Sequence, residues 1–368
     1  MKTAYFIPKH LDRNSLHDGS LVGNNHLMPR NQKKMLFLQI EMKLFLRHII
    51  LFFIAGAMIY MPLTWVVGNI GTVSNISYIP NNYGHMDLRL AEADSMCLGK
   101  GPDILFIGSS HCYRTFDTRM YDTANLKAFN LGSSNQTPKQ SLALLERYLE
   151  HWTPRLVVIE VHPDIMENSG NESAVDILSN THIDPPIRSM ALSQKNLRVF
   201  NTLCFRLFDQ TIHSAVIKGD SIINVSTNSG DTSLNVDFAY VRGGFVEVTP
   251  YCYKPVPIDP TTINARPDQL EALRQCLQSL KRCRIPCLLV EVPSTRARYE
   301  SYTNHRSFEQ QIMDIAASYA GTRYLNLNDD SRITVQLNDT TCFFDDDHLN
   351  QKGVAILNQF FLKCILSD

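Results

Sequence analysis

Hydrophobic residues in this chain form one long run near the N-terminus and a series of short runs after it. The long run extends from Ile49 to Gly71 and contains no Asp, Glu, Lys, Arg or His. A helix rises about 1.5 Å per residue, so a run of this length crosses a hydrocarbon core of roughly 30 Å. Pro62 would kink such a helix without ending it. The pattern predicts a single transmembrane helix at residues 49–71.

The charges that flank the run predict its orientation in a membrane. The residues before it include Lys33, Lys34, Lys43 and Arg47. After it, the first Asp, Glu, Lys or Arg is Asp87. The positive-inside rule therefore makes residues 1–48 a basic cytoplasmic head and places the chain from about residue 72 outside the cytoplasm. We expect a single-pass protein of the inner (cytoplasmic) membrane with its main domain in the periplasm.

Two other interpretations of the run are open, a helix buried in a globular core and a signal peptide that is removed by cleavage. The basic cluster directly before the run favours a membrane segment over a core helix. No small-x-small cleavage site follows at the distance typical of a signal peptide, which favours a retained anchor. Met35 or Met42 is an alternative start, because MKLFLRHIILFF resembles the beginning of an exported bacterial protein.

Beyond about residue 100, apolar runs of strand length alternate with segments of helical spacing. The expected strands are residues 103–108, 128–132, 155–161, 285–292 and 323–328. The expected helices are residues 138–151, 267–283, 305–320 and 351–365. The strand runs are continuously apolar rather than alternating, which is typical of strands buried on both faces. The pattern predicts an α/β fold, a three-layer α/β/α sandwich with a mainly parallel, flavodoxin-like sheet.

Two segments interrupt this alternation. Residues 72–100 carry turn signals such as PNNYG and are expected to be a stalk or lead-in. Residues 165–260 hold polar clusters such as NVSTNSGDTSLN, and we expect an insertion of a few helices and a loop-rich stretch that overhangs the site. The α/β domain is therefore expected to cover residues 101–368.

Composition narrows the classes of protein that fit this pattern. The chain has 368 residues, with 35 Lys and Arg against 36 Asp and Glu. This balance excludes a strongly basic nucleic-acid binder. Its 9 cysteines are scattered and lack the paired spacing of a zinc site, so we expect most of them to be small buried apolar residues.

Polar residues that suit acyl chemistry follow several of the expected strands. Ser110 comes just after Gly108 and enters a helix, a position that suits a nucleophile. Gly132 leaves its N–H open to an oxyanion. Asp345 and His348 are three residues apart, so the carboxylate can orient the ring while the other ring nitrogen takes a hydroxyl proton. The same acidic loop is also compatible with a calcium site.

The order of these motifs resembles the SGNH (GDSL-like) hydrolase and acyltransferase superfamily over roughly residues 100–368. FIGSS, FNLGSS and FDDDHLNQKG are similar to its first, second and last blocks. The resemblance implies a triad of Ser110, Asp345 and His348, with the N–H groups of Ser110 and Gly132 in the oxyanion hole. The third block departs, because Glu-Val-His-Pro replaces Gly-x-Asn-Asp. Two roles are then open for His162, an oxyanion donor in place of the Asn and a residue that caps the loop at the strand end.

Among SGNH members, the chain looks most like the membrane-anchored proteins of bacterial envelopes, relatives of the D-alanine-transfer and polysaccharide O-acetylation proteins. The resemblance implies a serine esterase or O-acyltransferase that acts on an extracytoplasmic glycan or envelope polymer. It implies no cofactor or metal, and a membrane acyl-donor protein as a partner. Arg114 is expected to bind a carboxylate or phosphate of the substrate. Two alternatives remain, an inactive glycan-binding or scaffold protein and a calcium-binding or adhesion module.

Overall fold

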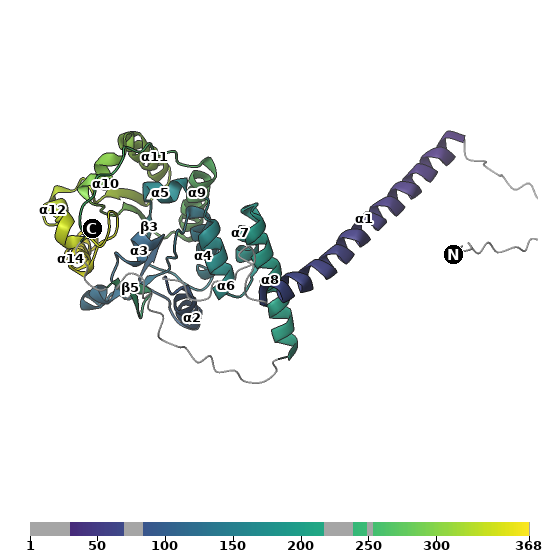
Figure 1. The fold of residues 1–368 in the computed structure, drawn as a ribbon, viewed down its shortest axis with the longest axis horizontal. Helices are drawn as coiled ribbons and strands as arrows, with labels where there is room; N and C mark the ends of the chain where they lie inside the picture. Colours follow the sequence, from purple (N-terminus) through teal and green to yellow (C-terminus); the bar gives the residue numbers. More distant parts are fainter. Residues whose placement is uncertain (1–29, 70–83, 217–237, 249–252, 368) are drawn as a thin grey trace, which may run out of the picture. The chain divides into compact units, whose positions relative to one another are not determined.

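The computed structural model describes residues 30–69, 84–216, 238–248 and 253–367. Contacts divide the chain into two compact units, Met1–Met58 and Ile59–Asp368. The second unit contains the α/β domain shown in Figure 1. Residues 1–29, which belong to the expected cytoplasmic head, and residues 72–83 of the expected stalk lie outside the described residues.

A helix is present where the membrane span is expected, and it begins earlier than the apolar run predicts. Helix α1 spans Arg30–Asn69 and includes Pro62. Its stretch Leu38–Asn69 has a mean hydropathy of 2.1 and only 6% of its most apolar window is buried, so it is long and apolar enough to cross a membrane. The early start follows from strong helix formers such as Gln, Glu, Lys, Leu and Met between residues 32 and 46. Residues 70 and 71, the predicted end, are outside the described part.

The predicted parallel sheet is confirmed. Its strands are β1 (Ile104–Ile107), β2 (Ala128–Asn130), β3 (Leu156–Glu160), β6 (Cys287–Glu291) and β7 (Thr322–Asn326). They are ordered β2-β1-β3-β6-β7, and every neighbouring pair is parallel. In register, Leu105 pairs with Val157 and Val157 pairs with Cys287. The strand order reverses direction between β1 and β3, which is the topological switch point of a doubly wound sheet.

Helices cover both faces of this sheet. Leu105 and Ile107 of β1 point into one hydrophobic cluster, whereas Ile104 and Phe106 point into the other. The first cluster is completed by α2 (Met86–Met96), α4 (Pro138–Tyr148), α5 (Pro163–Glu167), α6 (Asn171–Asn180), α7 (Pro185–Ser193), α8 (Leu197–Val216), α9 (Pro267–Cys283) and α11 (His305–Ala317). The second is completed by α3 (Ser110–Tyr113), η1 (Thr118–Ala124), α12 (Ser331–Thr334), α13 (Asp339–Cys342) and α14 (Gln351–Ser367). The short helix α10 (Arg296–Ser301) follows β6.

The expected insertion contains more regular structure than its composition suggests. It holds the helices α5 to α8 and an antiparallel hairpin of β4 (Phe238–Val241) and β5 (Phe245–Val248). Residues 217–237 and 249–252 of the loop-rich stretch lie outside the described residues. Five of the described cysteines, Cys112, Cys204, Cys276, Cys287 and Cys342, are buried, as expected, and each is a free thiol.

Part of the expected lead-in is packed into the domain. Helix α2 contributes Leu90 to the core, and its Arg89 is fully buried. The Arg89 guanidinium donates to Gly84 O at 2.6 Å and to Gly244 O at 2.8 and 3.0 Å, and it lies 4.7 Å from the centre of the Tyr113 ring. Arg89 therefore ties the β4–β5 hairpin to the domain, and packing starts before the predicted boundary at residue 101.

Replacing Arg89→Met should destabilise the full chain in detergent by on the order of 3 kcal/mol, because the carbonyls of Gly84 and Gly244 lose charged donors. Urea unfolding measures the free energy. The matched control is Arg306→Met, which changes an exposed helical arginine and should cost little. Equal stability of the two variants would contradict this role of Arg89.

Candidate active site

The carboxyl ends of β1, β2 and β3 carry three of the sequence motifs to one edge of the sheet. Ser110 follows β1, Gly132 follows β2, and His162 follows β3. Ligands of open α/β sheets bind at this edge, next to the switch point between β1 and β3. The sheet topology alone therefore brings these segments together.

The turn after β1 needs a glycine because it passes close to β3. At Gly108, φ is 158°, and an added Cβ would lie 2.6 Å from Glu160 Cβ. Ser109 then caps α3, with its Oγ accepting from the N–H of His111 at 3.2 Å. Ser110 is the first residue of α3 and is half-buried. Its Oγ therefore sits at a helix start, within reach of a substrate.

The structure brings Ser110, His348 and Asp345 together. Ser110 Oγ lies 2.9 Å from His348 Nε2. On the other side of the ring, His348 Nδ1 lies 2.9 and 3.0 Å from the two carboxylate oxygens of Asp345. Asp345 also accepts from the backbone N–H of His348 at 2.7 Å, which fixes the loop in front of α14. This geometry permits proton transfer between Ser110 and His348.

A second carboxylate, that of Asp347, contacts the same ring. Asp347 Oδ1 lies 2.7 Å from His348 Nδ1, and Asp347 Oδ2 lies 3.3 Å from His111 Nε2. Burial lowers the pKa of His348, but the charges of Asp347 and Asp345 outweigh it and raise that pKa to about 10. In turn, burial raises the pKa of Asp347, but His348 and His111 hold it well below its usual range.

Three imidazole rings form a stack behind the nucleophile. The ring centroids of His348 and His111 are 4.5 Å apart, and those of His111 and His162 are 3.9 Å apart. His162 is buried, and burial followed by the charge of His111 lowers its pKa well below the usual value. His162 is therefore a neutral ring at the end of the stack at neutral pH.

The structure places His162 differently from the expected oxyanion donor. Its Nε2 lies 3.3 Å from Ser294 Oγ, and its backbone N–H donates to Glu160 Oε1 at 2.6 Å. None of the contacts found for it within the described residues joins it to Ser110 or Gly132. The position of His162 is thus fixed by the stack with His111, the contact with Ser294 and the backbone hydrogen bond to Glu160.

The sequence suggests that the N–H of Gly132 is open to an oxyanion. In the structure it is not open, because the Asn130 side chain accepts a hydrogen bond from it. Gly132 N–H donates to Asn130 Oδ1 at 3.1 Å, while Asn130 Nδ2 donates to Cys112 O at 3.0 Å. Glycine is required here for close packing, since an added Cβ would lie 2.8 Å from Gly108 O. By contrast, no hydrogen bond among the described residues uses the N–H of Ser110, so this donor is available to an oxyanion.

Glu160 holds the turns of the site together and was not predicted from the sequence. Its carboxylate accepts from Ser109 N–H at 2.8 Å, Ser109 Oγ at 2.7 Å and His162 N–H at 2.6 Å. The side chain is buried, so these donors compensate its loss of water. The available signal was a glutamate at the end of an otherwise apolar strand run.

Arg114 lies near the nucleophile, one helical turn after Ser110, and packs on aromatic rings. Its guanidinium carbon lies 4.6 Å from the centre of the Phe238 ring and 5.7 Å from that of Tyr113. Its Nε is buried and has no hydrogen-bond partner within the described part of the chain. Cation–π contacts therefore hold Arg114 between α3 and the β4 strand.

Two groups of side chains place possible metal-ligand atoms within 4.8 Å of one another, one of them His111, His162 and Asp347. The His111 and His162 rings are stacked with an interplanar angle of 11°, so their in-plane lone pairs do not converge on a single ion. The other group, Asp345, Asp347 and His348, is engaged in the hydrogen bonds that orient the His348 ring. Neither arrangement matches a preformed metal centre.

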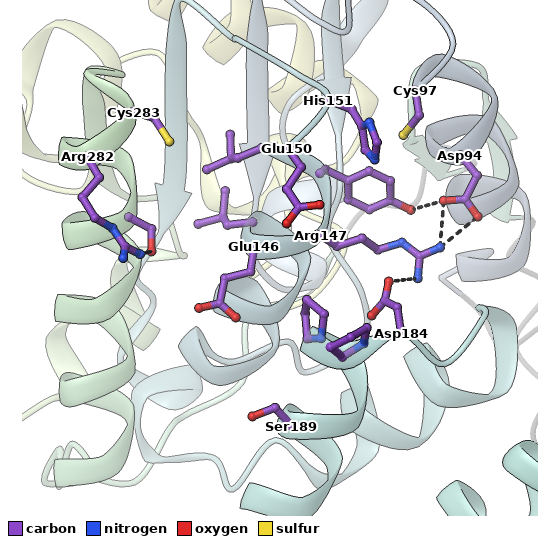
Figure 2. Close-up of a pocket in the computed structure, with 16 residues that line it drawn as sticks. Asp94, Cys97, Glu146, Arg147, Glu150, His151, Asp184, Ser189, Arg282 and Cys283 are labelled. Atoms are coloured by element: carbon purple, nitrogen blue, oxygen red, sulfur yellow. Dashed lines mark hydrogen bonds and ion pairs between the residues drawn. The ribbon is translucent and has the colours of Figure 1, made fainter.

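A large cavity lies elsewhere in the domain. It has a volume of about 840 Å³ and is lined by residues of α2, α4, α7 and α9. In Figure 2, the Arg147 guanidinium lies between Asp94 and Asp184, at 3.1 and 2.8 Å from their nearest oxygens. None of the predicted site residues lines it, and its Arg147 is paired with two carboxylates, so the candidate active site is the Ser110–His348 edge of the sheet.

Comparisons with known proteins found similar solved structures and no related sequence. No protein-family model and no curated protein matches the sequence. A GDSL-like lipase from Bacteroides thetaiotaomicron is similar in structure, with 10% identity, coverage of 78% of this chain and 99% of that chain, and a TM-score of 0.37. A Streptococcus pneumonia protein, described in relation to platelet activating factor, has 12% identity, 75% and 95% coverage, and a TM-score of 0.36. These scores describe partial overlap and say nothing of site residues.

Replacing Glu160→Gln should destabilise the full chain by about 1–3 kcal/mol, because one acceptor oxygen becomes an NH₂ group facing the N–H donors of Ser109 or His162. Urea unfolding in detergent measures the loss. Glu150→Gln, at an exposed helix end, is the matched control and should be neutral within about 0.5 kcal/mol. A neutral Glu160→Gln variant would refute the bridging role.

Proposed function

We propose that this chain is a membrane-anchored serine esterase or O-acyltransferase of the SGNH type. The observation that carries the proposal is the 2.9 Å contact between Ser110 Oγ and His348 Nε2, with Asp345 2.9 Å from the opposite ring nitrogen. These are the positions of a nucleophile, a general base and an orienting carboxylate. Their order along the chain is the one expected from the SGNH resemblance.

In the proposed reaction, Ser110 Oγ attacks an acyl carbonyl while His348 Nε2 takes the hydroxyl proton. Collapse of the tetrahedral intermediate breaks the ester bond, and His348 returns the proton to the leaving alkoxide. An acceptor hydroxyl then attacks the acyl-Ser110 ester and gives its proton to His348. Collapse of the second tetrahedral intermediate breaks the bond between the acyl carbon and Ser110 Oγ, and His348 returns the proton to Oγ as the product leaves. With water as acceptor the reaction is hydrolysis, and with a sugar hydroxyl it is transfer.

The oxyanion would be stabilised first by the free N–H of Ser110 at the start of α3. The N–H of Gly132 becomes a second donor only after it exchanges Asn130 Oδ1 for the oxyanion. The acidic loop stabilises the imidazolium that forms on His348, because Asp345 and Asp347 both contact Nδ1. The charge created by proton transfer therefore has partners in place before the reaction.

The substrate is proposed to be an extracytoplasmic glycan or another acylated envelope polymer. Helix α1 supports an anchored enzyme, and the basic residues before it support a periplasmic domain at the inner membrane. Arg114, whose Nε has no hydrogen-bond partner, would bind a carboxylate or phosphate of the polymer. A membrane protein that supplies the acyl group is the proposed partner for transfer.

The alternative function is a non-catalytic SGNH-like protein that binds glycans or scaffolds an envelope acylation system. Two observations favour it, namely the occupied N–H of Gly132 and the stacked position of His162 in the third block. Both reduce the number of donors that face a developing oxyanion. Activity of Ser110 distinguishes the two functions.

The full chain in detergent should react with a fluorophosphonate probe at Ser110, because the probe traps a serine activated by a base. Ser110→Ala should abolish labelling and lower ester hydrolysis by at least about a thousandfold. Ser134→Ala, which removes a nearby hydroxyl bonded only to Tyr113, is the control and should label normally. A folded parent that neither labels nor hydrolyses acetyl esters would support the non-catalytic alternative.

The raised pKa of His348 predicts an alkaline pH profile. Only the neutral ring accepts the Ser110 proton, so kcat/KM for an acetyl ester should rise with pH toward about 10. Asp347→Asn removes the largest charge that raises this pKa, so the rise should move to lower pH. Asp346→Asn, which removes a neighbouring acid with no contact to the His348 ring among the described residues, is the control. An unchanged profile in Asp347→Asn would contradict the assignment.

The same linkage affects stability. A folded-state pKa above the ordinary 6.5 stabilises the fold fully below pH 6.5, and this contribution is lost as pH rises through about 10. The Asp347→Asn variant should therefore be less stable than the parent at pH 6. Urea unfolding should show that the deficit shrinks as pH approaches 10.

A further inference from the structure

We propose that the turn between α7 and α8 rests in the headgroup layer of an anionic membrane and forms a second lipid contact beside α1. This inference depends on α1 being a membrane anchor and is independent of the catalytic proposal. It is drawn only from residues of the unit that begins at Ile59.

Large apolar side chains are exposed around this turn. Leu192 is 54% exposed, Leu197 is 69% exposed and Phe200 is 42% exposed. They lie at the end of α7 and the start of α8, labelled in Figure 1. Isolated exposed leucines are common, but three within nine positions on a single turn form a patch that needs a partner.

The patch lies next to the part of α1 that belongs to the same unit, residues 59–69. The Tyr60 hydroxyl donates to Asn201 Oδ1, and Trp65 Nε1 donates to Asp209 Oδ1 at 3.2 Å. Both contacts advance in the same direction along the two helices, so residues 60–65 of α1 and residues 201–209 of α8 run in the same sense. The start of α8 therefore lies beside Tyr60 rather than beside Trp65.

The polar partners locate the edge of the hydrocarbon layer. Asp209 bonds Trp65 and forms an ion pair with Arg206 at 2.9 Å, an arrangement that belongs outside the hydrocarbon. Tryptophan and tyrosine are enriched at membrane interfaces, which suits Trp65 and Tyr60. Since Leu197 precedes Asn201 by one helical turn, it lies at or just below this interface.

The charges around the patch favour anionic lipid. Arg188 and Lys195 are exposed, and no Asp or Glu occurs between Pro185 and Phe200. Basic residues beside exposed apolar side chains are the pattern of an interfacial membrane contact, because the apolar groups enter the acyl boundary while the cations stay with the headgroups. A second protein chain would explain the apolar groups but not this charge bias.

Tryptophan fluorescence in vesicles tests the contact directly. The full chain carrying Leu197→Trp is reconstituted in phosphatidylcholine vesicles with a minority of phosphatidylglycerol, with and without brominated acyl chains. We expect the emission added by the new tryptophan to shift to the blue and to be quenched by the brominated lipid. The matched control is Leu98→Trp, at a leucine that is 96% exposed outside the patch, which should emit as in water and resist quenching.

A further variant tests how much the basic residues contribute to membrane contact. Adding Arg188→Glu and Lys195→Glu to Leu197→Trp should reduce quenching in the anionic vesicles and leave it unchanged in phosphatidylcholine alone. Emission of Leu197→Trp that matches Leu98→Trp would overturn the proposal. A blue shift without quenching by brominated lipid would also overturn it, because the patch would then be covered by protein.

Discussion

Glu160 lies at the carboxyl end of β3 and accepts hydrogen bonds from the turns that follow both β1 and β3. A carboxylate buried in this way is stable only while its donors stay in place, so it fixes Ser109 and His162 relative to each other. Ser109 in turn caps the helix that begins with Ser110. The position of the nucleophile thus depends on a contact that is itself remote from the reacting atoms.

The second constraint is the density of charge around His348. Asp345 and Asp347 both approach Nδ1, and Asp347 also reaches His111. Two carboxylates at this distance repel each other, and a positive ring between them relieves the repulsion. The same arrangement favours the imidazolium state, which assists the charged transition state and limits the supply of neutral base at moderate pH. Proton affinity, rather than orientation alone, therefore governs the proposed activity.

Much of the fold follows from local sequence patterns. Continuous apolar runs identified every strand of the main sheet, and the helix at 267–283 was predicted with the bounds that the structure has. The order of the Ser110 and Asp345 motifs also led to side chains that the structure brings into contact. These features succeed because they depend on burial and on the shared edge of parallel strands.

Other features depend on contacts between distant segments, which no local pattern encodes. Asp347 looks like one acid in a solvated loop, and only the position of α3 brings His111 beside it. Asn130 closes the N–H of Gly132 by a side-chain rotamer. Arg89 lies in the segment expected to be a lead-in, where an arginine is typically exposed. In the structure it donates to the carbonyl of Gly244 in the β4–β5 hairpin.

The central claim is that Ser110 carries an acyl group during turnover, and mass spectrometry of the trapped intermediate tests it most directly. The full chain is mixed with an activated acetyl ester, quenched in acid within the first turnover, and digested. The account predicts a single acetyl group on the peptide that contains Ser110, absent from the Ser110→Ala variant. Turnover of the ester without acetylation of Ser110, or acetylation of another residue that persists in Ser110→Ala, would contradict it.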